Sequence, residues 1–242
     1  MFLYRPTPST LTLSKRLSTL AEVVVGGLVL LLLSYAFPRV IEGAEQRALA
    51  LLIYSVIGVG IVRFWPLGAL GWANRVTLLR GVLVALVAGG LSAEATTLAQ
   101  WQWLGIATAA LLLDGVDGFI ARKAHCQSAF GARFDMEMDA LLILLLSLAL
   151  ISHSGLGPWV LPIGAIRYAF VVAGGVYPWL KAPLFASRRR KAVCVWQVSA
   201  LLLALTPITS SETAAILALS ALFTLVYSFA VDVRWLYLRR LS

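Results

Sequence analysis

Four aspartates lie close together in a chain that has few acidic residues. Asp114 and Asp117 are three residues apart, Asp135 and Asp139 are four apart, and the whole chain has only 11 Asp and Glu. On helices, both spacings put the two carboxylates on one face. Carboxylate oxygens are the ligands that hard cations such as Mg²⁺ and Mn²⁺ prefer. We therefore expect all four aspartates to bind metal, with two divalent cations balancing the four negative charges.

The segment around the first pair also suits a phosphate group. Its residues read DGVDGFIAR, which places Gly118 beside Asp117 and Arg122 one helical turn later. Glycine permits close approach of a ligand to the backbone, and a guanidinium can donate to two phosphate oxygens at once. The residue types therefore predict a site for metal and phosphate together.

The elements that must position these side chains are membrane helices. Of the 242 residues, 60% are hydrophobic and 13% are charged, and the mean hydropathy is +0.89. A bilayer-spanning helix needs about 20 mostly apolar residues. By that rule the chain is an all-α polytopic membrane bundle of about eight transmembrane helices, over 19–37, 47–65, 75–93, 99–121, 135–153, 157–178, 192–207 and 212–232.

The basic residues give an orientation. With the N-terminus in the cytosol, 17 of the 20 Lys and Arg fall on the cytosolic side, Arg39 and Arg47 fall outside, and Arg167 lies within a span. This positive-inside pattern predicts that both termini are cytosolic, as is the aspartate site. It also accounts for the net charge of +9 without a nucleic-acid partner. The first span could alternatively be a signal peptide, but its apolar run is longer than usual and has no clean cleavage site.

Taken together, these residues resemble a known family, the CDP-alcohol phosphotransferases. Their signature is DxxDGxxAR, eight residues, then GxxxDxxxD, and this chain meets every fixed position, with Asp114, Asp117, Gly118, Ala121, Arg122, Gly131, Asp135 and Asp139. The looser resemblance runs from Asn74 to about residue 232. It implies a six-helix core at 74–242, preceded by residues 1–73 with a cytosolic segment and two extra helices.

The resemblance also implies roles for single residues. Asp114, Asp117 and Asp135 would hold one metal ion, Asp114, Asp135 and Asp139 the other, and Asp139 would be the catalytic base. The CDP part of the donor, a lipid such as CDP-diacylglycerol, would contact a second set of residues: Thr77, Arg80, Gly118, Ala121, Arg122, Ser128 and Gly131. In the segment NRVTLLR, Ala73 stands where many members have a proline before the asparagine, which predicts a less rigid entry into the helix.

The acceptor is a small alcohol whose identity rests on weaker clues. Arg167 inside a span needs a partner or a ligand, and with Arg190 and Lys191 it would bind a phosphorylated acceptor. This arrangement resembles the phosphatidylglycerophosphate synthases, which implies glycerol 3-phosphate. Choline or inositol phosphate stays open, and SRRRK at 187–191 could equally be an anchor on anionic membrane lipids.

Other classes of function are also compatible with acids in a membrane bundle. A divalent-cation transporter is one, although its polar groups would be spread across the membrane rather than gathered at one side. A pseudoenzyme that keeps the fold for assembly is another. The resemblance also allows a homodimer, and it favours a bacterial cytoplasmic membrane as the location.

Overall fold

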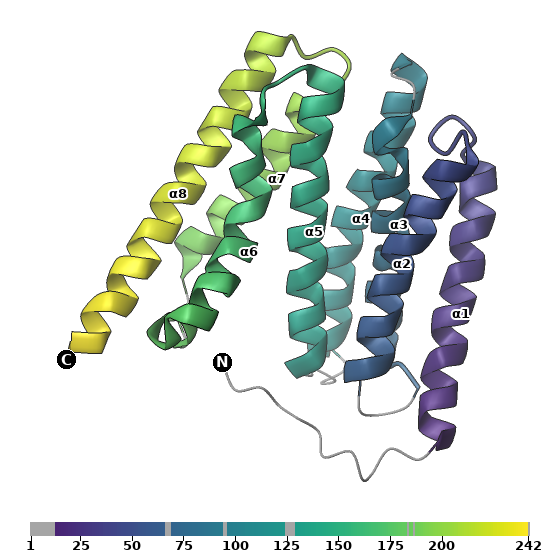
Figure 1. Cartoon of the computed structure of the whole chain (residues 1–242), viewed down its shortest axis with the longest axis horizontal. Helices are drawn as coiled ribbons and strands as arrows, with labels where there is room; N and C mark the ends of the chain where they lie inside the picture. Colours follow the sequence, from purple (N-terminus) through teal and green to yellow (C-terminus); the bar gives the residue numbers. More distant parts are fainter. Residues whose placement is uncertain are drawn as a thin grey trace. The chain divides into compact units, whose positions relative to one another are not determined.

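A computed structural model describes residues 13–65, 69–93, 96–123, 129–182, 184–185 and 187–241. Every regular secondary-structure element among these residues is a helix, which confirms the predicted all-α class. Eight α-helices are described there (Figure 1): α1 (Leu13–Ala36), α2 (Ala44–Phe64), α3 (Trp72–Gly89), α4 (Thr97–Lys123), α5 (Ala129–Ser154), α6 (Leu161–Val176), α7 (Arg188–Ala204) and α8 (Ser211–Leu241). Three short 3₁₀ turns accompany them: η1 (Gly90–Ser92), η2 (Pro158–Val160) and η3 (Pro178–Lys181).

The apolar helices identify a membrane protein. Within the described ranges, five helices are long and apolar enough to cross a bilayer: 16–36, 44–64, 74–92, 158–176 and 211–240. Each matches a predicted span. The predicted spans over α4, α5 and α7 coincide with helices, but that they cross the membrane stays a prediction.

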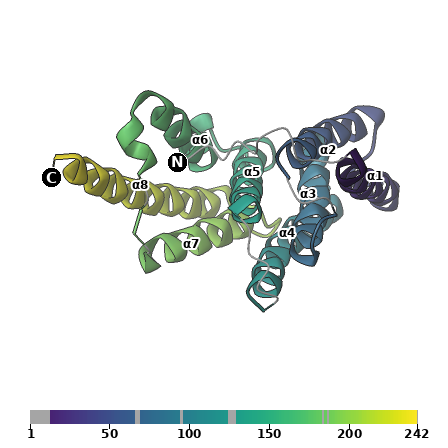
Figure 2. The ribbon, with the colours of Figure 1, turned by 90° about the horizontal axis from the view of Figure 1, so that it is seen from below.

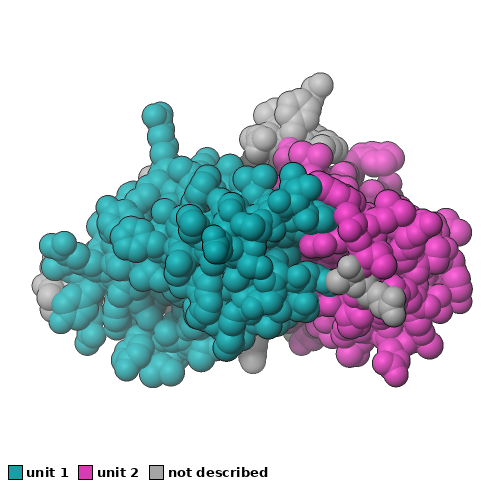
Figure 3. Space-filling view, turned by 90° about the horizontal axis from the view of Figure 1, so that it is seen from above, with its two compact units in different colours: residues 1–4, 143–242 teal, residues 5–142 magenta. Residues whose placement is uncertain are grey.

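The chain forms two compact units, coloured in Figure 3. Unit 2 comprises residues 5–142, and in it α3 contacts α1, α2 and α4. The end-on view in Figure 2 shows α3 among these three helices. Its membrane segment is 67% buried, whereas α1 and α2 are each 28% buried. The polar side chains of Asn74, Thr77 and Arg80 on α3 are accordingly buried in protein.

Unit 1 comprises the described residues from 143 onward, and α8 is its longest helix. In this unit α8 contacts both α6 and α7 and lies between them in Figure 2. Helix α5 ends at Ser154 and is followed by Gly155 with a φ of +65°, a conformation that favours glycine at a helix C-terminus. Prolines at the start of η2 and α6 then begin the next helix.

One helix pair in unit 1 is held close by a glycine. A Cβ atom added at Gly164 of α6 would lie 2.4 Å from Leu144 Cα and 2.9 Å from Leu144 N in α5. We expect Gly164→Ala to lower the free energy of unfolding by about 2 kcal/mol, because backbone atoms of a packed helix cannot move aside cheaply.

Thermal unfolding in detergent measures this loss. The matched control is Gly175→Ala on the same helix, where an added Cβ meets no atom within 4 Å. The control should match wild type or exceed it, because alanine favours helix over glycine. If the two variants were equally stable, α5 and α6 would not lie as close at Gly164 as the structure shows.

Two helix starts differ from the prediction. Residues 188–191, expected in a basic loop, form the first turn of α7, and Gly131 and Arg133 lie in the first turns of α5. Arginine and lysine are good helix formers, so a run of them extends a helix where a hydropathy rule places a loop. The predicted division at residue 73 stays a prediction.

Candidate functional site

Three of the four predicted aspartates converge in unit 2. Asp114 comes from α4, while Asp135 and Asp139 come from successive turns of α5. One carboxylate oxygen from each lies within 4.8 Å of the others. The spacing of four residues explains why the two α5 side chains share a face, as predicted. Asp114 adds the third carboxylate from α4.

Arg80 of α3 is the counter-ion of this cluster. Its side chain is 0% exposed, and Nη1 lies 2.8 Å from Asp114 Oδ1. The same guanidinium also pairs with Asp135 through Nη1 and with Asp139 through Nη2. Because α3 is the buried helix of unit 2, the guanidinium has no access to water and its charge is compensated by the three acids.

The carboxylates themselves are open on one side. The side chains of Asp114, Asp135 and Asp139 are 33%, 36% and 30% exposed, although Arg80 is buried behind them. The donor atoms are all carboxylate oxygens, which suits a hard divalent cation such as Mg²⁺ or Mn²⁺. The described residues therefore fit a divalent-cation site that is reached from the open side.

The remaining predicted donor and metal residues are only partly described. The backbone of Asp117, Gly118, Ala121 and Arg122 lies in α4, but their side chains and the whole of Ser128 lie outside the described residues. Thr77 is 4% exposed on α3, one turn before Arg80, and Gly131 is half-buried on α5. The structure therefore brings together Arg80 and three aspartates, and contact of these residues with CDP stays a prediction.

The predicted acceptor residues lie on α6 and α7. Arg167 is half-buried within the membrane segment of α6, and Lys191 is exposed in the first turns of α7. Arg190 donates through Nη2 to the carbonyl oxygen of Phe185, and its guanidinium carbon lies 5.5 Å from the Phe185 ring centroid. Whether these three side chains bind an acceptor stays a prediction.

Asp232 of α8 pairs with arginines of the first turn of α7, residues 188–191, which we call the basic turn. The sequence reasoning missed this acid. Its carboxylate accepts from Arg189 Nη2 at 2.5 Å and lies 3.5 Å from Arg190 Nη1, while Arg189 Nη1 donates to Ser228 O at 2.6 Å. Asp232 is 5% exposed. The sequence does hold one signal for this pair: Asp232 is an acid at the end of an apolar run, on the same predicted side of the membrane as the basic turn.

We expect Asp232→Asn to destabilise unit 1 by about 2 kcal/mol, because it leaves two arginines without their buried acid. That is below the roughly 3–5 kcal/mol for a fully buried pair, since both arginines keep some contact with solvent. Thermal unfolding of purified protein measures it. Glu212→Gln, an exposed acid at the other end of α8, should change stability by less than about 1 kcal/mol. A smaller effect of Asp232→Asn than of Glu212→Gln would refute the pairing.

Comparison with known proteins places this site in a family. A curated relative from Cereibacter sphaeroides, described as a CDP-diacylglycerol–glycerol-3-phosphate 3-phosphatidyltransferase, is 28% identical over 108 residues, which cover 44% of this chain and 48% of the relative. The match thus spans about half the length of that relative. No solved structure matches the chain.

The family model described as CDP-alcohol phosphatidyltransferase matches residues 70–227, which include α3 and all four signature aspartates. Since that match covers well over half of the 242 residues, the chain belongs to the CDP-alcohol phosphatidyltransferase family.

Proposed function

We propose that this protein transfers a phosphatidyl group from CDP-diacylglycerol to the hydroxyl of an alcohol and releases CMP. The observation that carries the proposal is the convergence of Asp114, Asp135 and Asp139 around one open site. Family membership supports the reaction class. The name of the Cereibacter sphaeroides relative favours glycerol 3-phosphate as the acceptor, with choline and inositol phosphate as alternatives.

In this proposal two Mg²⁺ or Mn²⁺ ions bind the four signature aspartates. Asp114, Asp117 and Asp135 hold one ion, and Asp114, Asp135 and Asp139 hold the other. When bound, the ions supply positive charge that stabilises the attacking and leaving oxygens of a phosphoryl transfer. Arg80 already offsets one of the four negative charges, so two ions would leave one positive charge in excess. That excess suits the anionic pyrophosphate of the donor.

The protein groups then act on the donor and the acceptor. Asp139 accepts the proton of the acceptor hydroxyl, whose oxygen attacks the phosphorus distal to cytidine. A new phosphorus–oxygen bond forms, the bond to the bridging oxygen breaks, and CMP carries that oxygen away. Backbone at Gly118 and Gly131, with the side chains of Thr77, Arg122 and Ser128, holds the nucleotide. No covalent intermediate with the enzyme is needed.

We further propose that the site faces the cytosol of a bacterial cell, with both termini on the same side of the cytoplasmic membrane. The positive-inside distribution of the Lys and Arg residues supports this orientation. In this arrangement the 74–242 core carries the chemistry. Residues 1–73 contribute the two extra helices, and two copies form a homodimer.

The reaction class is tested with purified protein, CDP-diacylglycerol and a panel of alcohols. Glycerol 3-phosphate, choline and inositol phosphate are each supplied with Mg²⁺ or Mn²⁺, and CMP release and product mass are recorded. We expect CMP and one phosphatidyl product in equal amounts, and no turnover in EDTA. If no alcohol reacts and the same protein conducts divalent cations in proteoliposomes, the enzyme assignment is wrong.

The acceptor site is tested through Arg167. If its guanidinium binds an acceptor phosphate, Arg167→Gln should raise KM for that acceptor about tenfold or more, since one charge-assisted hydrogen bond is lost. The KM for CDP-diacylglycerol should stay unchanged. Arg234→Gln, which removes an exposed arginine of α8, is the control and should alter neither constant. An unchanged acceptor KM in Arg167→Gln would exclude this role.

A further inference from the structure

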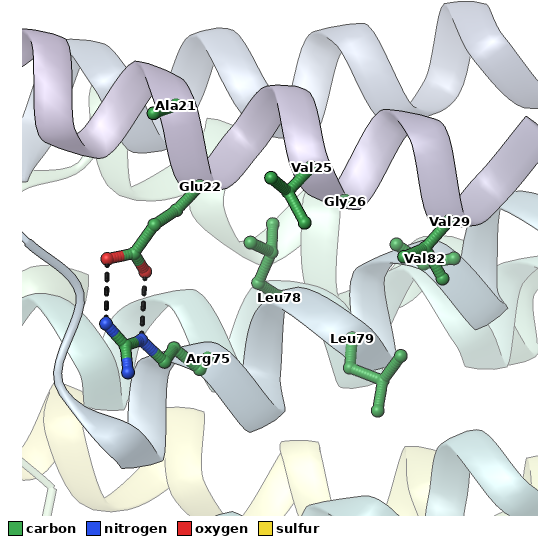
Figure 4. A pocket seen from close by; sticks show the side chains of 9 residues that line it. All are labelled: Ala21, Glu22, Val25, Gly26, Val29, Arg75, Leu78, Leu79 and Val82. Carbon is green, nitrogen blue, oxygen red and sulfur yellow. Dashed lines mark hydrogen bonds and ion pairs between the residues drawn. The ribbon is translucent and has the colours of Figure 1, made fainter.

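A groove between α1 and α3 lies apart from the aspartate cluster. It has a volume of about 350 Å³, within the range of roughly 300–1,000 Å³ that small-ligand pockets occupy. Figure 4 shows its lining: Ala21, Glu22, Val25, Gly26 and Val29 from α1, with Arg75, Leu78, Leu79 and Val82 from α3. Seven of these nine residues are apolar. Helix α1 precedes residues 70–227, so the family match does not account for this feature.

The groove has one charged end. Arg75 Nε donates to Glu22 Oε2 and Arg75 Nη2 donates to Glu22 Oε1, both at 3.1 Å. The backbone N–H of Leu70 also donates to Glu22 Oε1, at 3.2 Å. The third nitrogen, Arg75 Nη1, takes no part in the pair and points away from Glu22 in Figure 4. Both side chains keep exposed surface, 44% for Arg75 and 21% for Glu22.

This charged end lies at the level of lipid headgroups. Arg75 is the second residue of the membrane segment 74–92, and its guanidinium carbon lies 5.0 Å from the ring centroid of the exposed Trp72. Tryptophan with arginine at the end of an apolar helix is typical of the membrane interface. From Glu22 the apolar lining continues to Val29, about 10 Å along α1 at 1.5 Å per residue. The groove therefore runs from the interface into the hydrocarbon region.

The shape and the depth of the groove indicate a lipid chain as its occupant. Both walls are membrane segments, 16–36 and 74–92, so what fills the groove comes from the bilayer. Apolar contact alone selects no particular lipid there, since lipid tails are as apolar as the walls. Selection must come from the charged end.

The charged end is complementary to a headgroup that carries both signs. A phosphate can accept from Arg75 Nη1, while a primary ammonium can donate to the Glu22 carboxylate. An anionic headgroup without an ammonium would bring its phosphate near Glu22 and offer no donor to that carboxylate, so Arg75 alone would have to balance both anions. A choline headgroup has the charge but no N–H to donate. We propose that this groove binds one phospholipid with a phosphoethanolamine headgroup, with its headgroup at Glu22 and Arg75 and one acyl chain between α1 and α3.

Native mass spectrometry of the purified full chain in detergent tests this site. Dioleoyl phosphatidylethanolamine, phosphatidylcholine and phosphatidylglycerol are titrated separately, and the first bound lipid is quantified. We expect phosphatidylethanolamine to bind about tenfold more tightly than either of the others, the effect of one charge-assisted hydrogen bond. Glu22→Gln and Arg75→Gln should each remove that preference.

A matched pair of variants on α1 tests the groove itself. Val25 lines it and is 58% exposed, whereas Val24 is 53% exposed and is not part of the lining. Val25→Trp fills the groove and should weaken phosphatidylethanolamine binding about tenfold, because several methylenes lose their contacts. Val24→Trp adds the same indole elsewhere and should bind as wild type does. Arg63→Gln is the equivalent control for loss of an exposed arginine.

Three outcomes would overturn the proposal. Phosphatidylglycerol could bind as tightly as phosphatidylethanolamine, or Val25→Trp and Val24→Trp could bind the lipid equally. In the third outcome the wild-type protein is a dimer without bound lipid, and Val25→Trp is a monomer. The groove would then be a contact between two copies. Melting temperatures of the variants, measured with and without phosphatidylethanolamine, separate lost binding from misfolding. None of these results depends on the transferase activity.

Discussion

Asp139→Asn is expected to reduce kcat for CMP release by about 10³-fold, with the fold intact. The amide keeps the shape of the side chain but loses the negative charge, so it can neither accept the acceptor proton nor hold a cation as well. General-base catalysis contributes about 10²–10⁴-fold to such reactions. The measurement is CMP release at saturating CDP-diacylglycerol and acceptor.

Glu137→Gln is the matched control for this variant. It removes the same charge from α5 two residues earlier, on a different face of the helix. We expect its kcat to stay within about twofold of wild type, since Glu137 lies off the helix face that carries Asp135 and Asp139. If kcat fell equally in both variants, the total negative charge on α5 would matter rather than the position of Asp139.

A titration with Mg²⁺ separates the two roles assigned to Asp139. If the carboxylate only binds metal, a higher Mg²⁺ concentration should restore kcat in Asp139→Asn. If it also accepts the proton, kcat should stay low when the metal site is saturated. Full recovery of kcat at high Mg²⁺ would therefore remove the base assignment and leave a metal ligand.

The cluster could be foreseen because helix geometry makes side chains three or four residues apart neighbours. Asp135 and Asp139 share a face for that reason alone. Asp114 joins them from another helix, which spacing cannot show, but the scarcity of acids made a shared site the simplest explanation. The long apolar runs predict helices because a membrane segment must satisfy its backbone hydrogen bonds internally.

The long-range partners could not be foreseen. Arg80 precedes Asp135 by 55 residues and Asp139 by 59, and Arg189 precedes Asp232 by 43. Hydropathy places each residue along its helix but says nothing of the direction in which its side chain points. The Arg80 guanidinium pairs with three carboxylates, which the sequence does not indicate, and its contact with CDP stays a prediction. Arg189 and Arg190 of the basic turn pair with Asp232, and binding of acceptor or lipid by this turn stays a prediction.

Arg80→Met is expected to lower the melting temperature of the metal-free protein by about 10 °C. Methionine fills a similar volume but leaves three neighbouring carboxylates without the guanidinium that compensates them. Removing one partner of a buried ion pair costs roughly 3–5 kcal/mol. For a chain of this length, each kcal/mol lowers the melting temperature by about 2–4 °C. Thermal unfolding in detergent with EDTA measures the effect.

Divalent cation should reverse much of this loss. In Arg80→Met a bound Mg²⁺ supplies the positive charge that the guanidinium supplied, so Mg²⁺ should raise the melting temperature more than in wild type. Arg75→Met is the control on the same helix. It breaks an exposed ion pair with Glu22, which contributes little to stability, and should leave the response to Mg²⁺ unchanged. If Arg80→Met without metal is as stable as wild type, the three acids do not depend on Arg80 for compensation. If Mg²⁺ stabilises wild type and Arg80→Met equally, the cation and the guanidinium do not balance the same carboxylates.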